Sequence, residues 1–209
     1  PWITHSLKLY TSTFNKTITL ASGASTTGNI TLTQTDIDAI YALYTTQTYA
    51  PFNIEVTTLL AGVQLGAKRT IASNGNLTFN PTAIAPNFTV TPTYSDTNAT
   101  ITAITLNNQH IVQNKSNLRI SIPETTGVPK YGATAKTFAV TVNGVEKTAT
   151  YSTNAVTIDF GLVNVGTNTT AQVSVIDSRG ARTTKAINIT VFPYSNPTIT
   201  GLAPRINGF

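Results

Sequence analysis

The sequence predicts an all-β protein, and three observations carry that prediction. Apolar and polar residues alternate along many short segments, as they do on half-buried strands. Turn-forming residues separate these segments at intervals of roughly 8–12 residues. A Pro-x-[Phe/Ile]-Thr motif begins at Pro86 and again at Pro197, so its two copies lie 197 − 86 = 111 residues apart. An immunoglobulin-type sandwich takes roughly 100 residues, so we expect tandem immunoglobulin-like β-sandwiches.

This spacing divides the chain into three parts. We expect one immunoglobulin-like sandwich over residues 1–85, a second over residues 86–195, and a linker to a following domain over residues 196–209. Prolines 81, 86 and 92 interrupt the first junction, and prolines 193, 197 and 204 interrupt the second. Proline fixes φ and removes a backbone donor, so both linkers should be short and stiff.

The second sandwich has the clearest strand pattern. Phe138, Val140 and Val142 alternate with small polar residues, and Asn143-Gly144 follows them. Asn-Gly between two alternating segments predicts a hairpin, because a type I′ turn needs positive φ at both central residues. The second strand of this hairpin is expected at Val145 to Tyr151. Further strands are expected at Val90, around Ile101 and Ile104, at Leu118 to Ile122, at Val156 to Phe160, at Ala171 to Val175 and at Ile187 to Val191.

A second turn is predicted at Asp177-Ser178-Arg179-Gly180. Asp at the first position can accept bonds from the turn amides, and Gly at the fourth tolerates the left-handed conformation. We assign Arg179 only a place in this turn. On that assignment, Arg179→Ala should destabilise the protein much less than a change to a core residue such as Phe138.

The first sandwich contains one predicted helix, at residues 36–44. Ile37, Ile40, Tyr41 and Tyr44 share one helical face. Thr35 is the expected N-cap, with Asp38 reaching back to it. Strands are expected at Leu7 to Leu9, at Thr17 to Leu20, at Asn29 to Thr33, at Ile54 to Leu60, at Val63 to Ile71 and at Leu77 to Phe79.

Composition argues against several functional classes. Charged residues are 10% of the chain, against about 25% in an average soluble domain. The net charge is +5, but the 13 Lys and Arg residues are scattered and do not form the stripe typical of a nucleic-acid binder. With no Cys, disulfides and thiolate metal sites are excluded. No apolar run is long enough for a membrane-spanning helix.

Few residues could serve as catalytic groups or metal ligands. The chain has two histidines, His5 and His110, and eight carboxylates. No Gly-x-Ser-x-Gly motif is present, and the closest approach to a calcium loop, at Asp96, lacks most of the required acids. We therefore expect no enzyme activity, no cofactor and no metal site. Tyr41, Tyr44 and Tyr94 are candidate glycan contacts, with core packing as the alternative for Tyr41 and Tyr44.

Two stretches resemble a known family. Val173 to Thr183 is similar to the V-x-V-x-D-S-R-G hairpin of immunoglobulin-like repeats in siphophage tail and tail-fibre proteins. Ile187 to Pro197 is similar to the strand and exit linker of the same repeats. The likeness is best with minor structural proteins of phages that infect streptococci and related Gram-positive bacteria. It covers about half of the second sandwich well and the first faintly.

The resemblance implies a virion tail component, extracellular and without catalysis, that acts as a spacer or host-adhesion element. Its partners would be other tail or fibre subunits, in a homotrimer or as a monomer, and host cell-wall polysaccharide. We expect no nucleic-acid binding and no membrane insertion. The alternative is a carbohydrate-binding module or a repeat of a bacterial surface adhesin.

Overall fold

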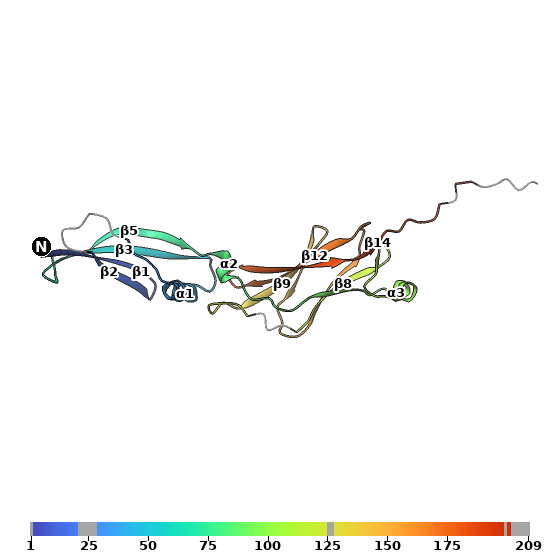
Figure 1. The fold of residues 1–209 in the computed structure, drawn as a ribbon, viewed down its shortest axis with the longest axis horizontal. Coiled ribbons are helices and arrows are strands. Elements are labelled where there is room, and N and C mark those ends of the chain that lie inside the picture. Colours follow the sequence, from blue (N-terminus) through green and yellow to red (C-terminus); the bar gives the residue numbers. More distant parts are fainter. Residues whose placement is uncertain (1, 21–28, 125–127, 199, 202–209) are drawn as a thin grey trace, which may run out of the picture.

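The computed structural model describes residues 2–20, 29–124, 128–198 and 200–201. Its elements follow one long axis, with the N-terminal strands at one end, α2 near the middle and β14 towards the other end (Figure 1). The sheets are mainly antiparallel, and the all-β prediction is confirmed. Residues 3–78 form one group of strands and residues 93–192 another, although the two groups share contacts described below. The division of the chain at residue 86 into independently folding parts stays a prediction.

The N-terminal group is a single five-stranded sheet in the order β2-β1-β3-β4, with β5 also paired to β3. Leu7 and Leu9 of β1 are buried on one face, while Lys8 points to the other face, as period-two alternation requires. The strand expected at residues 29–33 is absent. These residues form irregular coil before the helix. The strands are β1 (Ile3–Thr11), β2 (Phe14–Leu20), β3 (Tyr49–Leu60), β4 (Val63–Gln64) and β5 (Arg69–Thr78).

Helix α1 (Gln34–Leu43) lies at the end of this sheet nearest α2 (Figure 1). It begins two residues earlier than predicted. Thr33 is the N-cap in place of Thr35, and Asp36 completes the capping box in place of Asp38. The Asp36 carboxylate accepts the Thr33 amide at 2.7 Å and also pairs with Lys16 of β2. Asp36 therefore ties the start of the helix to the sheet, which a local sequence pattern could not indicate.

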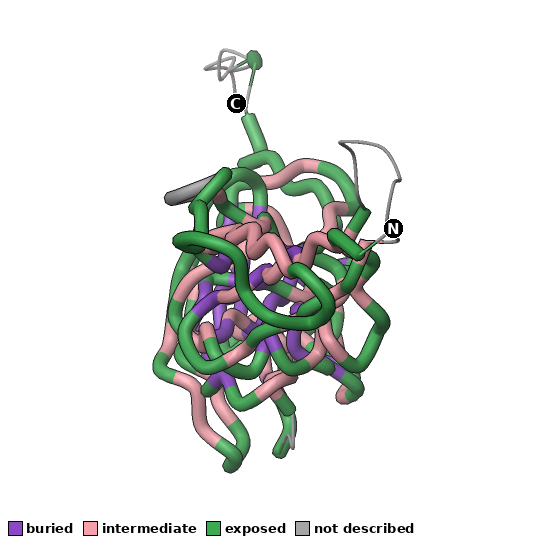
Figure 2. The backbone as a smooth tube through the Cα atoms, turned by 90° about the vertical axis from the view of Figure 1, so that its left-hand side faces the viewer, coloured by how far each residue is buried: buried purple, intermediate pink, exposed green. Residues whose placement is uncertain are grey.

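The C-terminal group is a two-layered sandwich. One layer has the order β10-β9-β12-β13 and the other the order β11-β8-β6. Phe138, Val140 and Val142 all face the core between the layers and are at most 2% exposed. In Figure 2 buried positions gather in the interior and exposed positions cover the outside. The strands are β6 (Thr93–Asp96), β8 (Asn117–Ile122), β9 (Ala135–Val142), β10 (Val145–Thr150), β11 (Val156–Leu162), β12 (Thr169–Asp177) and β13 (Arg182–Ile189).

The structure adds two short helices that the sequence prediction missed. Helix α2 (Pro81–Ile84) occupies the junction, with Asn80 as N-cap and Pro at its first position. Helix α3 (Ala99–Thr105) contains Ile101 and Ile104, so the strand predicted around them is wrong. Its β-branched composition favours strands, but the N-cap Asn98 and the left-handed Leu106 delimit one short helix. The strand predicted at Val90 is also wrong, since Val90 lies in a bend before β6. A parallel pair, β7 (Ile111–Val112) and β14 (Val191–Phe192), closes the far end.

Candidate functional site

Residues Asp177 to Gly180 form the turn between β12 and β13. The Asp177 carboxylate accepts the amides of Arg179 and Ala181, each at 2.9 Å, and Gly180 has φ +84°. The Gly180 amide donates to the Asp177 carbonyl at 3.0 Å. Asn143 and Gly144, between β9 and β10, have φ of 47° and 76°, the positive values that a type I′ turn needs.

Arg179 does far more than occupy this turn, which corrects the expectation above. The residue is 6% exposed, and the side chains of Arg179 and Asp177 are both fully buried. Its guanidinium points across the junction into the N-terminal group. Nε donates to the Tyr44 carbonyl at 2.9 Å, and Nη2 donates to the carbonyls of Tyr41 and Tyr131, also at 2.9 Å.

The remaining terminal nitrogen of Arg179, Nη1, makes two further hydrogen bonds. Nη1 donates to the Lys130 carbonyl at 3.1 Å and to the Asp177 carboxylate at 3.4 Å. A guanidinium has five N–H donors, so each donor of Arg179 has an acceptor. We call Arg179, its four carbonyl acceptors and Asp177 the arginine junction.

Two of the acceptors lie at the C-terminal end of α1. Tyr41 belongs to its last turn, and Tyr44 is its C-cap. Carbonyls at a helix C-terminus lack helical partners, and the helix dipole favours a cation there. The last turn of α1 has no basic residue of its own. Arg179, from the other strand group, supplies that cation.

Other contacts surround the arginine junction. Ser178 Oγ donates to the Thr45 carbonyl at 2.5 Å, and the ring of Tyr131 contacts that of Tyr41 with centroids 5.1 Å apart. Burial, together with a hydrogen bond to Asp38, raises the pKa of Tyr131 above its usual value. Ala181 packs into the small core formed by α1 and α2. The two strand groups are therefore joined by polar and apolar contacts at the same place.

The tyrosines predicted as glycan contacts are engaged in packing. Tyr41 is 7% exposed and packs edge-on against Phe79, so its ring cannot stack on a sugar in this structure. The hydroxyl of Tyr44 bonds to Thr11 at 2.5 Å. Half-buried Tyr94 packs against the sandwich core, and its hydroxyl accepts the Thr190 amide at 3.0 Å. The core-packing alternative is the one that the structure supports for Tyr41 and Tyr44.

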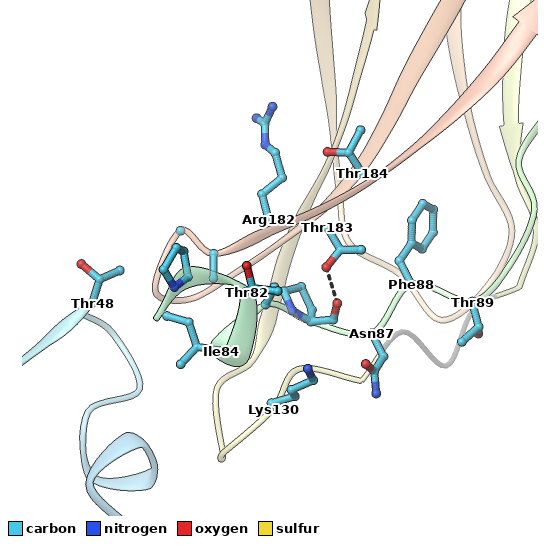
Figure 3. A pocket seen from close by; sticks show the side chains of 15 residues that line it. Thr48, Thr82, Ile84, Asn87, Phe88, Thr89, Lys130, Arg182, Thr183 and Thr184 are labelled. Atoms are coloured by element: carbon cyan, nitrogen blue, oxygen red, sulfur yellow. Dashed lines mark hydrogen bonds between the residues drawn. The ribbon is translucent and has the colours of Figure 1, made fainter. Parts of the chain in front are cut away.

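A groove of about 790 Å³ lies beside the arginine junction (Figure 3). Its lining comes from the linker between Pro81 and Thr89, from Thr48, from Lys130 and from residues 180–184 at the start of β13. Thr183 donates to the Pro86 carbonyl and so holds the linker against β13 (Figure 3). Motif reasoning could not find this groove, because its parts are far apart in the sequence.

The two histidines lie in different parts of the structure. His5 bonds to Thr58 in the N-terminal sheet, whereas His110 contacts Asn107 and the Phe192 ring at the far end. Across residues 2–20, 29–124 and 128–198, no three His, Asp or Glu side chains are grouped as metal ligands would be. A membrane-spanning helix is likewise absent from the described chain.

Comparison with known proteins supports the siphophage part of the resemblance. No curated protein matches the chain. A family described as siphovirus proteins of unknown function (DUF859) matches residues 3–207, which is nearly the whole sequence. This chain therefore belongs to that siphovirus family.

Proposed function

We propose that this phage protein is a non-catalytic structural component of a siphophage tail or tail fibre, where it acts as a stiff spacer. The arginine junction is the observation that carries the proposal. Siphovirus membership supports a role in the phage, and the D-S-R-G hairpin supports the tail of a phage of streptococci or related Gram-positive hosts. Under this proposal the protein lies in the virion, exposed to the exterior.

A spacer must keep its two ends at a set separation. Domains on a flexible linker move freely unless their interface is large and apolar or otherwise fixed. Here a planar guanidinium with five directed donors fixes the relative orientation of α1 and the β12–β13 turn. Lys185 also holds the linker, donating to the carbonyls of Thr89 and Val90 at 2.6 and 2.8 Å. These contacts resist both bending and twisting at the junction.

The roles of the carboxylates support a non-catalytic protein. Asp36 caps α1, and Asp177 organises the turn. Asp159 forms a two-point ion pair with Arg119, which lowers the Asp159 pKa. Glu146 pairs with Arg182 across the sheet surface. Each of these four acids is bound to a structural partner. A catalytic acid or base would instead have to be free to meet a substrate.

The proposed partners are other tail or fibre subunits, including further copies of this chain in a trimer. Contact with host polysaccharide would make the spacer an adhesion element as well. The alternative of a dedicated carbohydrate-binding module depended on exposed tyrosine rings, and the packing of Tyr41 and Tyr44 removes much of its basis.

The spacer proposal is tested by measuring the distance distribution across the junction. The chain has no Cys, so a Thr17→Cys and Thr148→Cys double variant accepts two spin labels without background. Both positions are exposed, one in each strand group. We expect one narrow distance distribution by pulsed electron paramagnetic resonance, and a broad one when Arg179→Ala is added. A broad distribution in the presence of Arg179 refutes the proposal.

A further inference from the structure

We propose that the groove beside the arginine junction binds a segment of an anionic saccharide or polyol chain that carries phosphate or carboxylate groups. The inference deepens the host-polysaccharide contact of the proposed function and rests on it, whereas the spacer role needs no ligand. It rests on the charge, the hydrogen-bonding groups and the fixed shape of the groove.

The charged side chains that line the groove are all positive. Lys130 and Arg182 are in its lining, and no Asp or Glu is among the described residues that line it. The Lys130 ammonium lies 3.4 Å from the Ala83 carbonyl, which is a long contact that leaves donors for a ligand. The Arg182 guanidinium contacts only one oxygen of Glu146, at 3.3 and 3.4 Å. Both cations are therefore available to an anion at modest cost.

The neutral part of the groove offers groups that suit hydroxyls. Thr48, Thr82, Asn87 and Thr89 are exposed and line the groove. Hydroxyl and amide groups both donate and accept, so they match the mixed donor and acceptor pattern of a sugar or polyol. Figure 3 shows Thr48 and Thr89 at opposite ends of this lining, with Ile84 and Thr183 between them.

The lining of the groove argues against a nucleic acid as the ligand. Binding of single strands relies on aromatic rings open to stacking. Phe88 is the aromatic residue in the lining, and it is only 5% exposed because it packs into the sandwich core. Hydrogen bonding and charge therefore remain as the means of recognition.

The walls of the groove are fixed in place before any ligand arrives. Gly180 and Ala181 lie next to the arginine junction, and Thr183 holds the linker through the Pro86 carbonyl. A preformed site loses less conformational entropy on binding. Since both strand groups contribute lining, we expect binding to require an intact junction.

The experiment compares the full chain with two double variants. Lys130→Gln with Arg182→Gln removes the two cations of the groove. Lys68→Gln with Arg69→Gln removes one exposed Lys and one exposed Arg at the opposite end of the N-terminal sheet, so both variants lose the same charge. Titration calorimetry uses poly(glycerol phosphate), polygalacturonate, neutral dextran and a DNA oligonucleotide as probes.

We expect poly(glycerol phosphate), polygalacturonate or both to bind, and dextran not to bind. Because hydrogen bonds to charged groups are strong, the groove variant should bind about tenfold more weakly or worse. The Lys68 and Arg69 variant should bind like the unmodified chain. The stronger of the two anionic probes identifies phosphate or carboxylate as the recognised group.

Three results overturn the inference. One is no binding of either anionic probe, and another is an equal loss in both double variants, which would indicate unspecific attraction. The third is DNA binding of similar strength with the same dependence on Lys130 and Arg182, which would make the groove a general polyanion site. None of these results bears on the spacer proposal, which the spin-label distances test separately.

Discussion

Replacing Arg179 by Ala should be among the most destabilising single changes in this protein. The substitution removes all five donors of a fully buried side chain. The carbonyls of Tyr41, Tyr44, Lys130 and Tyr131 would each lose a bond, and the buried Asp177 carboxylate would lose its cation. Removing one partner of a buried ion pair costs about 3–5 kcal/mol. Water entering the space would recover part of the carbonyl bonding, so we expect a loss in that range and not a larger one.

The assay is urea-induced unfolding of the full chain at neutral pH. Arg182→Ala is the matched control, because Arg182 is three residues away but exposed, and its ion pair with Glu146 is worth about 0–1 kcal/mol. Arg179→Lys should recover only part of the loss, since one ammonium cannot reach carbonyls arranged around a planar fork. If Arg179→Ala and Arg182→Ala lower the free energy of unfolding equally, the account of the arginine junction is wrong.

Three further changes probe separate parts of the fold. Phe138→Ala should cost about 3–5 kcal/mol, because it leaves a cavity at a residue that is 0% exposed; thermal unfolding measures it. Gly144→Ala should cost roughly 1–2 kcal/mol from left-handed backbone strain alone, since an added Cβ would meet no other atom. Gly201→Ala is the control and should be neutral, because an added Cβ has open space there too and Gly201 has no positive φ. The Lys16 and Thr33 bonds lower the Asp36 pKa from 3.8 to about 2, so the stabilisation from Asp36 is present above pH 3.8 and is lost as the pH falls towards 2. Denaturant midpoints measured from pH 5 to pH 2 should therefore fall less steeply for Asp36→Asn than for the unmodified chain.

Patterns that repeat locally were enough to predict the sandwich. Phe138, Val140 and Val142 alternate in the sequence and all face the core. The Asn143-Gly144 hairpin followed from the same reasoning, because its backbone requirement lies within two residues. The error at Ile101 and Ile104 has the opposite cause. A helix of seven residues has too few turns to show a period, and its β-branched residues mimic a strand.

The candidate site was less accessible to sequence reasoning. Arg179 was assigned only a turn role because arginine in a polar turn is exposed in most proteins. Its acceptors Tyr44 and Tyr41 lie 135 and 138 residues away in the sequence. Backbone carbonyls occur at every residue, so no side-chain pattern marks those that receive a guanidinium. The groove beside the arginine junction was missed for the same reason, since the linker and β13 meet only in the folded chain.

The arginine junction also links the end of α1 to the orientation of the two strand groups. Helices often end with a residue in the left-handed conformation, but Tyr44 has φ −121° and ψ 81°. Its amide bonds to the Tyr41 carbonyl at 3.3 Å, a long contact. Much of the C-terminal capping of α1 therefore comes from Arg179 and, at Thr45, from Ser178. Because these bonds exist only in one relative placement, the last turn of α1 and the stiff junction should form and break together.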